Sequence, residues 1–95
     1  MSKKIEPDLR PEVEIELDFP VTIDGEKSTS ITMRRPKGGD HIWMEKQKGA
    51  ETEKMFAMVA RLCNVTPEFV AEMDDFDIAK ADAQYGAFRG DVAPA

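Results

Sequence analysis

The chain has 95 residues, of which 34% are charged, and its formal net charge is −6. This length is typical of one domain, and the acidic balance disfavours loose electrostatic binding to nucleic acid or to anionic lipid. The single cysteine, Cys63, excludes an intramolecular disulfide and a cysteine-rich metal site. Because no segment resembles a signal peptide or a membrane span, we expect a cytoplasmic protein.

Residues 1–12 are expected to form a flexible arm, because they combine two prolines with several charges. Residues 13–23, VEIELDFPVTI, then alternate apolar and polar side chains. This pattern predicts a strand with one buried and one solvated face. Pro20 lacks an N–H donor, so the strand should lie at a sheet edge or bend at that residue.

The dipeptide Asp24-Gly25 predicts a turn into a second strand, which Pro36 ends, so that residues 13–35 form a hairpin. A two-residue loop with regular pairing would place Ile23 opposite Glu26. The apolar rows of the two strands would then point to opposite faces of the sheet. A longer loop or a bulge restores them to one face, and we predict one of these two features.

Capping signals and apolar spacing divide residues 40–88 into short helices. The predicted fold is therefore α+β, with an N-terminal β-hairpin followed by three to four short α-helices. This single small domain spans residues 13–89, and residues 90–95 form a frayed tail. The expected N-caps are Asp40, Thr52, Thr66, and either Asp74 or Asp75.

Catalytic and metal chemistry find little support in the residue pattern. His41 is the only histidine, and a nucleophilic pair would need it beside Cys63 or a serine. Asp74, Asp75 and Asp77 lack the glycine and the closing glutamate of a calcium loop. Helix capping and first-turn charge explain these acids. We therefore predict no catalytic residue, no cofactor and no metal.

Residues 55–75 have the outline of a helix-turn-helix, and a small DNA-binding regulator is the alternative function. The second helix would present Glu68 and Glu72 where a DNA-binding protein needs basic and amide side chains. These carboxylates would repel phosphates. Two helices packed in a core are the better interpretation of this segment.

The stretch SITMRRPKGGDH, residues 30–41, combines two arginines, a lysine and two glycines in an acidic chain. A bound anion is disfavoured there, because Asp40 would occupy the free N–H groups at the helix start. Arg34 and Arg35 exceed what the turn requires. Trp43 and Met44, in a chain with six methionines, indicate an adaptable apolar surface. These four residues, Arg34, Arg35, Trp43 and Met44, are the candidates for contact with a partner protein.

Two segments carry a family resemblance: VTIDGEKSTSITMRRPKGGD and MFAMVARLCNVTPEFVAEMDDFDIAKADAQYGAF. Their order and spacing, from about Phe19 to Phe88, resemble the phage tail assembly chaperone family of Mu-like prophages and related contractile-tailed phages. Each motif alone has a structural explanation. Their order, spacing and total length together are fairly specific.

The resemblance implies a non-enzymatic protein of the host cytoplasm that acts in virion morphogenesis. Its partner would be the tape measure protein, which it would coat and keep soluble before tail tube polymerisation. The chain would be the short form, and a ribosomal frameshift would yield a long form as a second partner. The family supplies no catalytic residues. A homo-oligomer could form through the hairpin edge or through the Trp43 helix.

Overall fold

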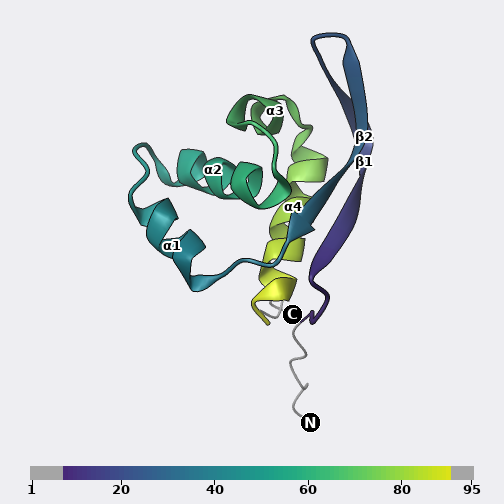
Figure 1. Ribbon diagram of the computed structural model, residues 1–95. Coiled ribbons are helices and arrows are strands. Elements are labelled where there is room, and N and C mark those ends of the chain that lie inside the picture. Colours follow the sequence, from purple (N-terminus) through teal and green to yellow (C-terminus); the bar gives the residue numbers. More distant parts are fainter. Residues whose placement is uncertain (1–7, 91–95) are drawn as a thin grey trace.

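The computed structural model describes residues 8–90, which form a two-stranded antiparallel sheet and four helices (Figure 1). The predicted α+β architecture, a hairpin followed by short helices, is confirmed. Most of the predicted arm, residues 1–12, and most of the predicted tail, residues 90–95, lie outside the described residues. The elements are β1 (Glu12–Ile23), β2 (Glu26–Arg34), α1 (Gly38–Glu45), α2 (Glu51–Cys63), α3 (Pro67–Glu72) and α4 (Asp75–Phe88).

The strands are joined by a tight two-residue turn. Ile23 pairs with Glu26 across it. Asp24 and Gly25 both have positive φ, at 50° and 80°. Two consecutive positive φ angles define the type I′ turn, whose twist matches that of a hairpin. The loop is therefore short, and the register problem posed by a short loop must be solved within the strands.

A bulge in β1 solves the register problem. Glu16 pairs with Ser30, but the next pair along the ladder joins Val21 to Ser28. Residues 17–20 of β1 thus oppose Thr29 alone, at the position where Pro20 cannot donate a ladder hydrogen bond. Of the two alternatives predicted from the sequence, a longer loop or a bulge, the structure has the bulge. The buried residues of the sheet are Ile15, Leu17 and Val21 of β1, and Ile31 and Met33 of β2.

Phe19 lies inside this bulge and departs from the alternating pattern. Its side chain is 52% exposed. Its ring meets Phe76 edge-on, with 6.2 Å between the ring centroids. The prediction that the apolar residues of the first strand share one buried face is therefore wrong at Phe19, because the bulge interrupts the two-residue period there.

The helices lie on one side of the hairpin, with α1 farthest from the sheet (Figure 1). α2 contacts β2, α4 contacts β1, and α1 packs against α2. Met33, Val70 and Ala81 have no exposed surface and lie in the core beneath the hairpin. Full burial of a side chain such as Met33 stabilises the fold by about 1.5–3 kcal/mol relative to an exposed position.

Two predicted helix starts are wrong. α1 begins at Gly38 after the N-cap Lys37, so Asp40 is the third helical residue. The Asp40 carboxylate accepts a hydrogen bond from the Lys37 backbone N–H at 2.8 Å, reaching back to the cap instead of forming it. α2 begins after the N-cap Ala50, so Thr52 lies inside its first turn and caps nothing.

The other predicted caps are correct. The Thr66 hydroxyl accepts a hydrogen bond from the Phe69 N–H at 3.1 Å and starts α3. The Asp74 carboxylate accepts one from the Phe76 N–H at 2.9 Å and starts α4. Each satisfies one backbone donor that the first helical turn leaves free. These contacts are local, which is why the sequence pattern reveals them.

Asp77 binds the bulge, a role that its position in the sequence does not reveal. Its side chain is completely buried. Its carboxylate accepts hydrogen bonds from the backbone N–H groups of Asp18 and Phe19, each at 3.0 Å. The Lys80 ammonium lies 3.5 Å from Asp77 and donates to the Glu16 carbonyl oxygen at 2.9 Å. Interpreting Asp77 only as a first-turn charge is therefore wrong, since it supplies hydrogen-bond acceptors to the bulge.

Candidate partner-binding groove

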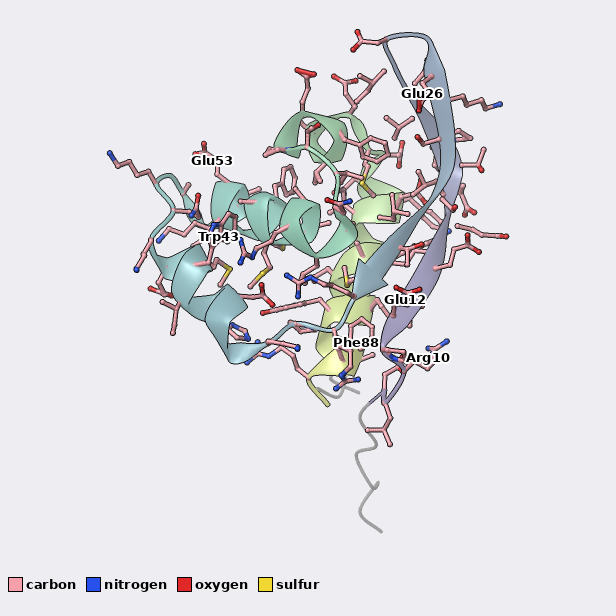
Figure 2. All side chains as sticks on the ribbon, in the orientation of Figure 1. Arg10, Glu12, Glu26, Trp43, Glu53 and Phe88 are labelled. Carbon is pink, nitrogen blue, oxygen red and sulfur yellow. The ribbon has the colours of Figure 1, made fainter. Side chains whose placement is uncertain are left out.

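A buried carboxylate, that of Asp40, connects the end of β2 to α2. Arg34 donates two hydrogen bonds to it, at 2.8 and 2.9 Å. The Arg61 Nε–H donates a third, at 2.8 Å. The Arg61 guanidinium also lies over the Trp43 ring, 4.6 Å from its centroid. Trp43 lies between α1 and α2 (Figure 2), so Asp40 and Arg61 join two predicted partner-binding residues, Arg34 and Trp43, into one network.

This network keeps Asp40 ionised. The hydrogen bonds from Arg34 lower the pKa of Asp40 far below its usual range; burial opposes this, and Arg61 and the Lys37 N–H reinforce it. Two guanidinium groups and one carboxylate leave one positive charge. The Arg34 and Arg61 side chains are 42% and 38% exposed, so this charge reaches the surface.

Arg35 fastens the residues before β1 to the end of α4. Its guanidinium donates to the carbonyl oxygens of Asp8, of Arg10 at 3.3 Å and of Phe88 at 3.1 Å. It also lies over the Phe88 ring, 5.1 Å from the centroid. Arg10 and Phe88 lie close together at the same end of the molecule (Figure 2). Both predicted arginines, Arg34 and Arg35, thus make contacts within the fold, and their contact with a partner stays a prediction.

A groove with an apolar floor lies between α1, α2 and α4, with a volume of about 210 Å³. Met44, the fourth predicted residue, lines it. The apolar lining continues with Met55, Met58 and Val59 of α2 and Tyr85 of α4. Charged side chains of both signs complete the lining: Glu45, Glu51, Lys54, Asp82 and Arg89.

Methionine is the most frequent residue in the lining of this groove. Met44, Met55 and Met58 are three of the six methionines in the chain. Met44, Met55 and Tyr85 are half-buried and present apolar surface at the mouth. Unbranched methionine side chains adapt to irregular partners. An apolar groove of this kind suits one face of an amphipathic helix. The sequence signal for it was the methionine excess, which does not reveal which methionines converge.

Among the described residues, no group of side chains is arranged for nucleophilic catalysis or for binding a metal ion. Burial raises the pKa of the Cys63 thiol to about 12, so the thiol is protonated at neutral pH and a poor nucleophile. The His41 ring faces Tyr85, with 6.3 Å between the centroids. Among residues 8–90, no three His, Cys, Asp or Glu side chains are placed to hold a metal ion. Within the same range, every helix is too short or too polar to cross a membrane.

The helix-turn-helix hypothesis gains no support. α2 and α3 are joined at Asn64, which adopts a left-handed conformation with φ 53°. α3 has only six residues and buries Phe69 and Val70. Its exposed face carries Glu68 and Glu72. A helix whose exposed side chains are acidic is poorly suited to phosphates and base edges.

Comparison with known proteins gives one match. The family model described as "Phage tail assembly chaperone proteins, E, or 41 or 14" matches residues 14–90. The matched region covers nearly all of the hairpin and all four described helices. Neither the curated proteins nor the solved structures contain a significant match to the chain.

Proposed function

The chain belongs to the phage tail assembly chaperone family, and we propose that it binds the tape measure protein and keeps it soluble before the tail tube polymerises. Family membership supports a role in tail assembly. A chaperone for a long helical protein needs an apolar binding surface together with its own solubility. The net charge of −6 favours solubility of the chain.

The observation that carries this proposal is the methionine-lined groove between α1, α2 and α4. It offers apolar surface from Met44, Met55 and Tyr85, and charged side chains stand at its margin. The apolar face of a helix from the tape measure protein would occupy the groove, and its polar flanks would face these charges. While the helix is bound, its apolar face cannot associate with other copies of the tape measure protein.

The proposal is tested by co-expressing the chain with the tape measure protein and measuring the soluble fraction of the latter. The variant Met44→Glu places a charge in the groove, and we expect it to lower the soluble fraction at least about fivefold. The matched control is Ile42→Glu on the same helix, because Ile42 is 62% exposed and lies outside the groove lining. Equal solubility with Met44→Glu and wild type would reject the groove as the binding site. A tape measure protein that is equally soluble without the chain would reject the chaperone function.

Three further parts of the proposal follow from the family. The protein is non-enzymatic and acts in the host cytoplasm, and a frameshifted long form is a second partner. Mass spectrometry of the products of the native coding region tests for that long form.

Arg34, Arg35 and Trp43 remain proposed partner contacts in addition to Met44. Arg34→Lys keeps the charge, so partner affinity should persist if the contact is electrostatic, whereas the paired hydrogen bonds to Asp40 are lost.

A further inference from the structure

We propose that a second copy of this chain docks on the free edge of β2, so that two hairpins form one four-stranded antiparallel sheet. The inference rests on the difference between the two edges of the hairpin and on the distribution of charge along β2. It does not depend on the groove or on the identity of the partner protein.

The edge of β1 is protected by the fold. The Asp77 carboxylate accepts hydrogen bonds from the N–H groups of Asp18 and Phe19, and Lys80 donates to the Glu16 carbonyl oxygen. The bulge and Pro20 lie in the same segment. Side-chain caps, bulges and prolines are devices that keep a second strand from pairing with an exposed edge.

The edge of β2 has none of these protections. In the part of the chain that the structure describes, no hydrogen bond reaches the backbone of residues 26–34 from any element other than β1. Residues 28–33, STSITM, contain neither a charge nor a proline. Because the outward N–H and C=O groups of an edge strand are unpaired, such a strand is a template for strand addition.

The space beside this edge is open. A hollow of about 580 Å³ lies between β2 and the end of α2, lined in part by Ser30 and Thr32. A second hollow of about 380 Å³ continues it toward the turn, and both are lined by Ser28, Val65 and Phe69. The small hydroxyl side chains of β2 leave its backbone accessible along the strand, and the apolar wall provides surface that a docked strand would cover.

The charges at the two ends of β2 favour a second copy as the occupant. Asp24 and Glu26 stand at its start and outweigh Lys27, whereas Arg34 stands at its end. Antiparallel pairing of two copies about a twofold axis brings each acidic start beside the other copy's basic end, twice in one interface. The hydroxyl residues in the middle of the strand then meet their own counterparts, and cross-strand Ser and Thr pairs form hydrogen bonds.

Sedimentation equilibrium of the full chain, at concentrations up to about 1 mM, measures the dimer dissociation constant. Glu26→Lys should raise it about 3- to 30-fold, because the substitution reverses both end-to-end charge pairs. Thr29→Pro should raise it at least about tenfold, because a proline in the middle of the edge strand disrupts pairing with a second strand. Thr29 faces the bulge and has no partner in the β1 register, so the hairpin itself should persist. The control Glu72→Lys makes the same charge change on α3 and should leave the constant unchanged.

Circular dichroism establishes whether each variant is folded. If Thr29→Pro unfolds, the effect of Glu26→Lys on the dimer dissociation constant tests the proposal by itself. A chain that is monomeric throughout the concentration range overturns the proposal. So does a dimer that neither Glu26→Lys nor Thr29→Pro weakens, because its interface must lie elsewhere. If the chain is monomeric and Thr29→Pro instead weakens binding of a tape measure fragment, the edge receives a strand of that protein and the second copy is rejected.

Discussion

Replacing Asp77 by alanine should destabilise the fold far more than replacing its neighbour Asp75. Both acids lie in the first turn of α4. Asp75 is exposed, whereas the Asp77 side chain is completely buried and accepts two backbone hydrogen bonds from the β1 bulge. If helix charge were the only role of these acids, the two substitutions would have the same effect.

The magnitude follows from the lost contacts. A hydrogen bond to a charged group contributes about 1.5–3 kcal/mol. Asp77 accepts two, but their donors lie near the surface, where water replaces part of the loss. We therefore expect Asp77→Ala to lower the free energy of unfolding by about 2–4 kcal/mol. Loss of the exposed charge in Asp75→Ala should cost about 0.3–1 kcal/mol.

Urea-induced unfolding measures both values, with Trp43 fluorescence and far-UV circular dichroism as probes, because Trp43 is the only tryptophan. Asp77→Asn adds a pH test, since it keeps the side-chain size and removes the charge. Burial would raise the pKa of Asp77, but the N–H groups of Asp18 and Phe19 and the Lys80 ammonium together lower it. The carboxylate therefore stabilises the fold above the unfolded pKa of about 3.9, and this contribution is lost as the pH falls further. The stability difference between wild type and Asp77→Asn should shrink below about pH 4.

Two results would refute this reasoning. The first is an Asp77→Ala variant no less stable than Asp75→Ala, which would mean that the hydrogen bonds to the bulge contribute nothing. The second is a difference between wild type and Asp77→Asn that stays constant from neutral pH to about pH 3, since the lost charge would then have no part in stability.

Three other experiments test separate parts of the structure. Asp40→Asn should lower the free energy of unfolding, measured in urea, by about 1–3 kcal/mol, because it weakens the charge-assisted hydrogen bonds from two arginines. An unchanged midpoint of the urea-induced unfolding would show that these hydrogen bonds do not stabilise the fold. Gly25→Ala should destabilise the fold by about 1 kcal/mol, because φ at this residue is +80°, even though no atom lies near the added methyl group. Gly39→Ala, which lies inside α1 and is equally free of contacts, should stabilise the fold by up to about 1 kcal/mol. Effects of the same sign in both variants would refute this reasoning. Native Cys63 should react with a thiol reagent at pH 8 at least about a hundredfold more slowly than in urea, because it is buried and its pKa is raised to about 12; equal rates would refute its burial.

The groove illustrates how far sequence reasoning reaches. Met44 was a candidate from composition and from its place beside Trp43, and it does line the groove. For Met55 and Tyr85 the sequence predicts only a place in one of the short helices within residues 40–88, because periodicity places a residue on a helix face without saying which helix lies opposite. Their convergence depends on how α1, α2 and α4 pack, and no local pattern contains that information.

Local hydrogen bonds made the hairpin and several helix limits predictable. The alternation of residues 13–23, the turn at Asp24-Gly25 and the caps Thr66 and Asp74 all depend on neighbours within a few positions. The need for either a longer loop or a bulge also followed from the sequence, because a two-residue loop and two apolar rows on one face are incompatible in a regular ladder.

The tertiary structure determines which hydrogen-bond donors the buried carboxylates meet. Asp77 and the bulge are 58 or 59 residues apart in sequence, and Asp40 joins Arg34 to Arg61 across two helices. A buried carboxylate requires donors wherever the fold brings them, so an acid that is interpreted locally as a cap or a first-turn charge becomes a link between distant segments. The chain's local conformations are thus encoded by neighbouring residues, whereas the pairing of its buried charges and the exposure of Phe19 depend on the packing of the hairpin against the helices.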